Sequence, residues 1–71
     1  MTGMMEFMVC DVLEDGTLSD LFFPVVHRFD ATEADVMRAF GNQFGWMVRH
    51  MGNGIYENQY GRRFAVRKVS R

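Results

Sequence analysis

The 71-residue chain has little of what a disulfide scaffold, a metal site or a membrane span requires. Cys10 is the only cysteine, so no internal disulfide can form, which fits a reducing compartment. The two histidines, His27 and His50, are isolated, and no CxxC, HxH or HExxH pattern gathers metal ligands. The longest uninterrupted apolar run, residues 21–26, is about a third of the length of a membrane span. We therefore expect neither a metalloprotein nor a membrane protein.

The N-terminus also lacks the features of a signal peptide. No basic segment precedes its apolar residues, and Glu6 interrupts the apolar stretch. These features favour a soluble, cytoplasmic protein. A pI near 6.0 argues against a general nucleic-acid coat, which normally carries a clear basic excess.

Length and composition indicate one small domain. A hydrophobic fraction of 48% with 14% aromatic residues excludes intrinsic disorder. A chain this short buries only roughly 60% of its unfolded surface, so its core is marginal unless a partner adds to it. We place the domain at residues 6–71 and expect residues 1–5 to stand outside it as a disordered N-terminus.

The charges are sorted along the chain. Residues 1–35 hold eight acids against one base, a net of −7, and residues 36–71 hold seven bases against one acid, a net of +6. The formal total of −1 hides this separation. Such halves suggest a contact surface of definite electrostatic character, provided that the fold does not interleave them. If their strands are neighbours, part of the separation is instead used in cross-strand attraction.

The order of local patterns predicts an α+β fold: a small antiparallel sheet, β-β-α-β-β with a possible fifth strand, and one helix packed on one face. Residues 6–13 and 18–29 are typical of a hairpin around Asp15-Gly16. Pro24 lies inside the second of these strands and cannot donate to a ladder. That strand is therefore expected to be an edge, or to be bulged at the proline.

A helix is expected to start within residues 30–35. Either Asp30 with Glu33 or Thr32 with Asp35 can form a capping pair, and Gly45 is a good terminator. Residues 46–51, 55–60 and 63–69 then read as strands of a meander separated by glycine-containing turns.

One helix can cover only one face of such a sheet, yet both faces of the N-terminal hairpin are apolar. An uncovered apolar patch usually marks a protein contact. We expect either a homodimer through the sheet or its edge or a different protein partner. A strongly curled sheet that wraps both sides of its own hairpin is the alternative.

No catalytic arrangement is apparent. The hairpin register places Cys10 and His27 about six residues apart along the ladder, roughly 20 Å at 3.3 Å per residue. Cys10 is therefore interpreted as a small buried apolar residue. The paired carboxylates belong to a turn and to a helix start, and no glycine-rich phosphate loop is present. We expect no enzyme, no catalytic residue, no metal and no cofactor.

Two charged groups are candidate partner-binding residues. The acidic group would occupy an arginine-rich groove on another protein, and its members are Asp11, Glu14, Asp15 and Asp20. The basic and aromatic group combines stacking rings with phosphate-pairing groups, and its members are Tyr56, Tyr60, Arg62, Arg63, Arg67 and Lys68. The alternatives are solvated turn and cap residues for the first group and an edge strand protected by its charges for the second. Phe64 and Val66 are expected to lie in the core.

Residues 61–66 (GRRFAV) are similar to part of the RNA-recognition signature of a basic and aromatic sheet. They depart from it at Arg63, where that motif has glycine, and at Val66, where it has a second aromatic residue. The predicted fold also has one helix rather than two.

The strands, the helix start at residues 31–35 and the closing turns at residues 52–54 and 61–64 resemble small phage-encoded inhibitors of the anti-CRISPR type. The resemblance covers most of the chain and lies in the architecture, so no functional residue is carried over. It implies a stoichiometric inhibitor that covers a functional surface of a bacterial defence complex.

The leading interpretation is therefore a non-enzymatic protein-binding module of this inhibitor kind. A small nucleic-acid-binding domain that uses the C-terminal strands is a second interpretation. A subunit or antitoxin of a larger assembly is a third.

Overall fold

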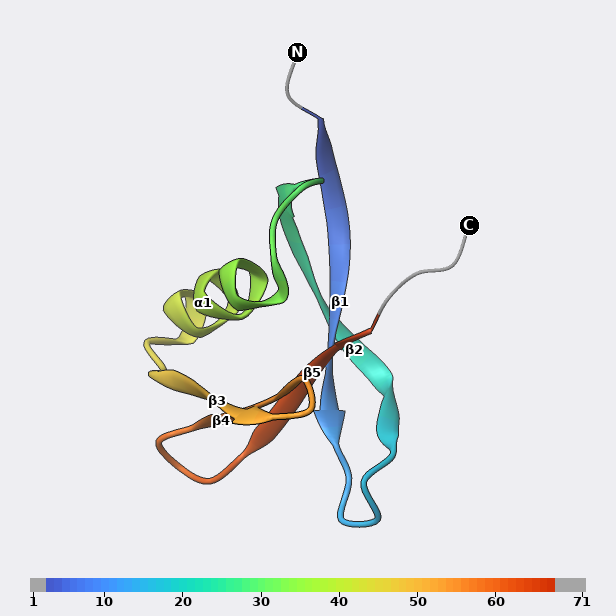
Figure 1. Ribbon diagram of the computed structural model, residues 1–71, viewed down its shortest axis with the longest axis vertical. Helices are drawn as coiled ribbons and strands as arrows, with labels where there is room; N and C mark the ends of the chain where they lie inside the picture. Colours follow the sequence, from blue (N-terminus) through green and yellow to red (C-terminus); the bar gives the residue numbers. More distant parts are fainter. Residues whose placement is uncertain (1–2, 68–71) are drawn as a thin grey trace.

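The computed structural model describes residues 3–67, which form one five-stranded antiparallel sheet and one helix (Figure 1). The elements in chain order are β1 (Met4–Val12), β2 (Leu18–Arg28), α1 (Glu33–Phe44), β3 (Val48–Gly52), β4 (Ile55–Asn58) and β5 (Arg63–Arg67). The strand order is β2-β1-β5-β4-β3. The predicted α+β fold, with its fifth strand, is confirmed.

The β1–β2 hairpin turns at the predicted Asp-Gly pair. Leu13 N donates to Thr17 O at 2.8 Å, and Gly16 N donates to Leu13 O at 2.9 Å. Gly16 has φ 87°, the left-handed conformation that ends a type I turn in a three-residue hairpin loop. Asp15 Oδ1 accepts hydrogen bonds from both Thr17 N and Thr17 Oγ1, which fixes the loop.

Pro24 lies on an edge strand, as predicted, because β2 has a neighbour on one side only. Phe29 N donates to Gly3 O, so hydrogen-bonded pairs alternate from there along the ladder. The pair of Met8 with Pro24 then falls between two hydrogen-bonded pairs. The proline nitrogen faces away from β1 and costs the ladder no bond. The register shift in this hairpin lies between Cys10 and Val12 instead.

Strand β5 lies in the interior of the sheet, between β1 and β4. The expectation of a charge-protected edge strand at this position is therefore wrong. Phe64 is fully buried and Val66 packs against the core, as predicted, so one face of β5 is covered while both of its edges are paired. The two halves of the chain are therefore not interleaved: β2 and β1 of the acidic half lie together, β5, β4 and β3 of the basic half lie together, and the two groups meet where β1 pairs with β5.

The N-terminal boundary at residue 6 is also wrong. Met4 and Met5 belong to β1, where they pair with Arg28 and His27. The physical reason is the length of β2, because its eleven residues need a partner along their C-terminal half. Lys68 and the other residues after Arg67 lie outside the described residues.

Helix α1 begins at the second of the two predicted capping pairs. Thr32 Oγ1 accepts from Asp35 N, and Asp35 Oδ2 accepts from Thr32 N, both at 3.1 Å. These hydrogen bonds hold the pKa of Asp35 below its usual value. Gly45 ends the helix in the left-handed conformation, with φ 71°. Among residues 3–67 no helix is long and apolar enough to cross a membrane.

Gly41 allows the chain to fold back tightly after the helix. A Cβ at this position would lie 2.8 Å from the carbonyl oxygen of Trp46. Trp46 N in turn donates to Gly41 O at 2.8 Å. Gly41, although glycine is unfavourable inside a helix, therefore allows the segment that leads into β3 to pack closely against α1.

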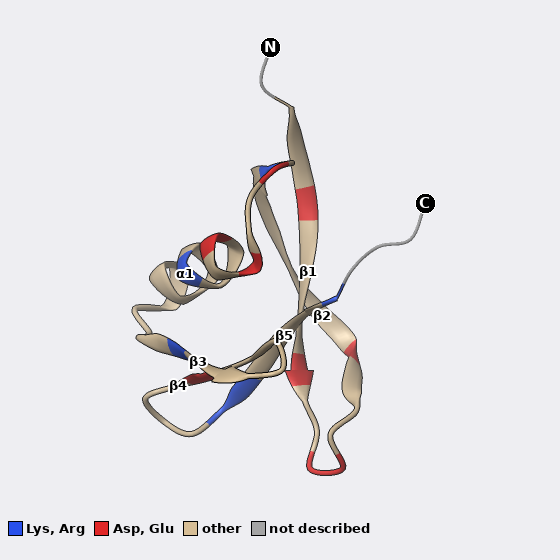
Figure 2. Cartoon of the chain, viewed as in Figure 1, with Lys and Arg blue, Asp and Glu red and all other residues tan. Residues whose placement is uncertain are grey.

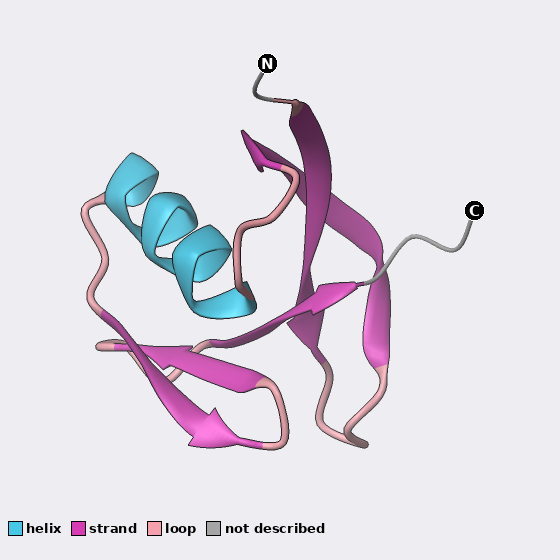
Figure 3. Cartoon of the chain, turned by 45° about the horizontal axis from the view of Figure 1, so that its top comes forward, coloured by secondary structure: helices cyan, strands magenta, loops and turns pink. Residues whose placement is uncertain are grey.

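The core lies between α1 and one face of the sheet. Its buried members are Val9, Val25, Val36, Met37, Phe40, Tyr56 and Phe64. The sheet is strongly twisted, and the β1–β2 hairpin runs across β3 and β4 rather than alongside them (Figures 1 and 3). Cys10 is as fully buried as its neighbour Val9, although successive strand residues point to opposite faces. Cys10 is thus covered on the face that points away from α1, whereas Phe22 and Val26 of the same face are exposed, so the sheet does not wrap both sides of the hairpin.

Candidate functional site

Asp11 and Arg62 join the two charged halves of the chain. Arg62 Nε donates to Asp11 Oδ1 at 2.8 Å, and a terminal nitrogen of Arg62 donates to Asp11 Oδ2 at 2.9 Å, across 51 residues of sequence. The Arg62 guanidinium also lies 5.2 Å from the centre of the Phe64 ring and 5.8 Å from that of Trp46. The hydrogen bonds from Arg62 to Asp11 raise the arginine's pKa. Both residues are therefore engaged within the molecule.

Glu57 binds two arginines on neighbouring strands. Its carboxylate accepts from Arg49 of β3 at 3.2 Å and from Arg63 of β5 at 3.3 Å. These bonds lower the pKa of Glu57. Arg63 is thus paired with the single acid of its own half of the chain.

Three more of the predicted contact residues have structural roles. A terminal nitrogen of Arg67 donates to Ser19 O at 3.1 Å, which ties β5 to β2. The hydrogen bonds from Thr17 that fix the hairpin loop lower the pKa of Asp15. Tyr56 is only 8% exposed and packs in the core, so its predicted role as a contact ring is wrong.

The predicted contact residues do not form one surface. Acidic residues lie at the hairpin tip, along β1 and β2 and at the start of α1, whereas basic residues lie mainly on α1, β3 and β5 (Figure 2). Glu14, Asp20 and Tyr60 are exposed and have no side-chain partner among the described residues. Lys68 lies outside those residues. The sequence identified the charges, but not their pairing.

The residues weighed for catalysis are far apart. Cys10 pairs with Phe22 and His27 pairs with Met5, a separation of five residues along β1. The predicted burial of Cys10 is confirmed. His27 Nδ1 accepts a hydrogen bond from Arg28 N at 2.8 Å. Within residues 3–67 no three His, Cys, Asp or Glu side chains are placed to hold a metal ion.

The face of the β1–β2 hairpin that points away from α1 is apolar. Residues directly opposite one another in a ladder share a face, as do alternate residues of one strand. By this rule, the exposed or half-buried apolar side chains of this outer face are Met4, Met8, Phe22, Pro24 and Val26. Met4 and Val26 are 62% and 61% exposed. The charged residues of the hairpin on the same face, Glu6 and Arg28, lie toward one end, and Arg67 of β5 lies on this face opposite Met8, with its side chain bonded to Ser19 O of β2.

Leu21 adds a further exposed apolar side chain. Alternation along β2 places it with Phe23 and Val25 on the core side, yet Leu21 is 80% exposed. The register shift between Cys10 and Val12 interrupts the alternation here, and Leu21 N donates to Ser19 Oγ instead of joining the ladder regularly. This exposure was not predictable from the alternating pattern.

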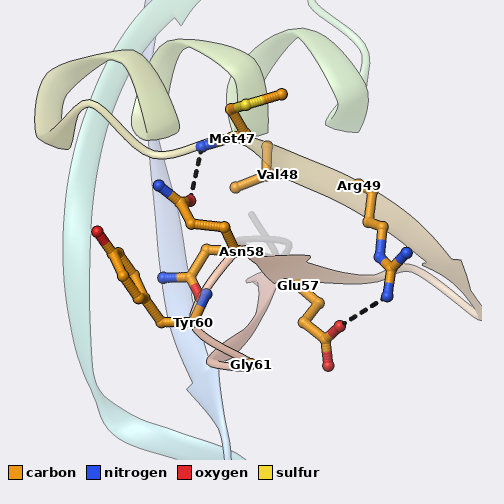
Figure 4. Close-up of a pocket in the computed structure, with 8 residues that line it drawn as sticks. Met47, Val48, Arg49, Glu57, Asn58, Tyr60 and Gly61 are labelled. Atoms are coloured by element: carbon orange, nitrogen blue, oxygen red, sulfur yellow. Dashed lines mark hydrogen bonds and ion pairs between the residues drawn. The ribbon is translucent and has the colours of Figure 1, made fainter.

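Two hollows flank β3, and neither was predicted. One, of about 590 Å³, lies between β3, β4 and the turn after β4, with the exposed Met47 and Tyr60 at its rim (Figure 4). Gln59 Oε1 accepts from Met47 N across this hollow at 2.9 Å. The other, of about 410 Å³, lies between α1 and β3, and Arg38 and His50 are among the residues that line it.

No family model, curated protein or solved structure matches this chain in comparisons with known proteins.

Proposed function

We propose that this protein is a non-enzymatic protein-binding module whose main contact surface is the outer face of the β1–β2 hairpin. The observation that carries this proposal is the set of exposed apolar side chains on the sheet face that α1 leaves uncovered. The largest apolar patch on a monomeric protein is often a functional contact site. Burial of about 400 Å² of such surface would contribute on the order of 10 kcal/mol before the costs of association.

The charged groups support this proposal better than they support nucleic-acid binding. A phosphate-binding surface on β4 and β5 needs available cations and exposed rings. Arg62 and Arg63 instead contact carboxylates, and Tyr56 is buried. Tyr60 is the exposed ring of the predicted aromatic pair.

The finer proposal is a cytoplasmic inhibitor, of phage or mobile-element origin, that covers a functional surface of a host defence complex. It rests on the small size of the chain and on the architectural resemblance. An inhibitor of this kind needs only a stable scaffold and a surface that binds. A subunit or antitoxin of a larger assembly meets the same requirement. The identity of the partner would distinguish these alternatives from an inhibitor.

Affinity capture from host cells tests the proposal. The wild-type chain is compared with a Phe22→Ser, Val26→Thr variant, because both side chains are exposed and the change leaves the core intact. A Glu14→Lys, Asp20→Lys variant is the matched control, since it changes exposed charges on the same hairpin. We expect the first variant to lose a partner that the control retains. Loss with the charge variant alone would contradict an apolar contact.

A further inference from the structure

The two edges of the sheet are protected to different degrees. On β2, the residues whose backbone groups face outward are Phe22, Pro24, Val26 and Arg28. Pro24 has no N–H, and the N–H of Arg28 donates to His27 Nδ1. Half of the outward donors on this edge are therefore already removed, which is a usual protection against strand addition.

The β3 edge is open. Asn58 N donates to Arg62 O, so alternate β4 residues, 56 and 58, bond to β5 while 55 and 57 bond to β3. Since Arg49 is opposite Glu57, the backbone groups of Val48 and His50 face away from β4. Within residues 3–67 no other hydrogen bond to these two backbones is found. The strand contains no proline, and its protection is limited to the exposed charge of Arg49 and the register shift between His50 and Gly52.

The hollows beside β3 suit the side chains of an added strand. Alternate residues of an extended segment point to opposite faces of the sheet. On one face they would meet the hollow between α1 and β3, and on the other the hollow that Arg49, Met47 and Tyr60 line. Backbone bonds along an edge with pockets for alternate side chains are the elements of recognition by strand addition.

The hollow between α1 and β3 has an excess of positive charge among the residues that line it. In the hollow beside α1, Arg38 lies with His50, and no carboxylate lines it. Two acids belong to the first turn of α1: Glu33, whose Oε1 is 3.5 Å from the Cβ position at Gly54 in the β3–β4 turn, and Asp35, whose carboxylate binds Thr32 and is close enough to Arg38 for their charges to interact. The other hollow is lined by Arg49 and Glu57, which form an ion pair, so the acidic side chain of an added strand is placed in the hollow beside α1.

We propose that the open edge of β3 binds an extended acidic segment of a partner protein as an additional strand, with its backbone on Val48 and His50 and an acidic side chain near Arg38. A second copy of this chain fits this edge less well. In the register that pairs Val48 with His50 of a second copy, Arg49 lies directly opposite its own counterpart, and in any register the second copy brings the same arginines, Arg38 and Arg49, to a lining without a free carboxylate. The proposal goes beyond the function proposed above, because it uses a different edge and does not require the outer face.

The test uses a short capped peptide of alternating valine and glutamate, and the same peptide with lysine in place of glutamate. Binding is followed by amide NMR of the full-length protein. We expect the glutamate peptide to shift the amide signals of Val48 and His50 more than those of Phe22 and Val26. N-methylation of the peptide on its hydrogen-bonding side should abolish the effect.

A matched pair of variants isolates the backbone contact. His50→Pro removes the outward N–H without removing a ladder bond, as Pro24 does on β2, whereas His50→Ala loses only the ring. We expect His50→Pro to weaken peptide binding by about tenfold relative to His50→Ala. If His50→Pro does not fold, Arg38→Glu is compared with Arg28→Glu on the other edge. Only the Arg38→Glu variant should bind the lysine peptide more tightly than the glutamate peptide.

Several results would overturn the proposal: no binding at millimolar peptide, equal binding of both peptides, or equal affinity of the two His50 variants. Val48 and His50 signals that shift with protein concentration alone would show that a second copy occupies the edge. The Phe22→Ser, Val26→Thr variant should bind the peptide normally. A failure of the peptide therefore leaves the outer-face proposal standing, and a failure of partner capture leaves the β3 proposal standing.

Discussion

Replacing Gly41 with alanine should destabilise the protein, although the same change in an ordinary helix stabilises it. Alanine is favoured over glycine in a helix interior by about 1 kcal/mol. Here the new Cβ would lie 2.8 Å from the Trp46 carbonyl oxygen, closer than real Cβ atoms approach. That oxygen belongs to backbone, and the Trp46 amide is itself held by its bond to Gly41 O. Relief of the contact therefore requires the segment after the helix to move.

The expected cost combines two effects. Weakening the backbone bond costs about 1 kcal/mol, and forcing an extra methyl into a packed site costs typically 1–3 kcal/mol. Set against the helix gain of about 1 kcal/mol, Gly41→Ala should lower the free energy of unfolding by about 2 kcal/mol.

Equilibrium urea unfolding, followed by the fluorescence of the single tryptophan, measures this change. Asn42→Ala is the control, because Asn42 is exposed and should gain stability by a few tenths of a kcal/mol. A Gly41→Ala variant as stable as the wild type would contradict the close approach of the segment before β3 to α1. It would also contradict the geometry described for the hollow between α1 and β3.

Three further predictions follow from single contacts. Arg62→Ala should lower the free energy of unfolding by about 1–2 kcal/mol, because it removes a bidentate ion pair and ring contacts. The control, Arg38→Ala, should change the free energy of unfolding by less than about 0.5 kcal/mol. Urea titration of both variants measures the difference, and equal stability would contradict a stabilising role for Arg62. The folded-state pKa values of Asp15 and Asp35 lie below the ordinary 3.8, so their stabilising contribution is complete above that value and is lost as the pH falls below it. The urea midpoint should therefore decrease on acidification, with a shallower decrease for the Asn variants, and an equal slope would contradict these bonds. Cys10 should react with a thiol reagent only in denaturant, because it is fully buried, and rapid reaction of the native protein would contradict that burial.

Local signals predicted the local structure well. The Asp15-Gly16 turn, the capping pair of Thr32 with Asp35 and the terminator Gly45 each depend on residues a few positions apart. Pro24 identified an edge strand because a missing N–H has the same consequence in any sheet. In each case the interaction that determines the local structure lies within a short segment of sequence.

Strand order was not predictable in the same way. Alternation in β5 identifies Phe64 as a core residue, but it does not say which strands lie on either side. The interior position of β5 follows from pairing with β1, which depends on residues more than fifty positions away. For the same reason, the burial of Tyr56 on β4 was missed.

The candidate surfaces differ in the same way, because one of them follows from local sequence patterns and the others depend on the strand order. The apolar outer face was predictable, because both faces of the hairpin are apolar and one helix covers only one of them. The Asp11–Arg62 pair and the hollows beside β3 arise from residues brought together by the sheet order. Most of the charged residues predicted to form two contact surfaces instead form ion pairs and hydrogen bonds within the molecule, and a few acids stay exposed.

The salt dependence of the captured complex tests the central claim most directly. Contacts between exposed charges weaken as the Debye length shrinks from about 10 Å at 0.1 M salt to about 3 Å at 1 M, whereas apolar contacts do not. If the outer face of the hairpin holds the partner, the complex should persist across this range, and the Phe22→Ser, Val26→Thr variant should lose it at every salt concentration. A complex that dissociates at high salt, and that this variant forms as well as the wild type, would contradict the account.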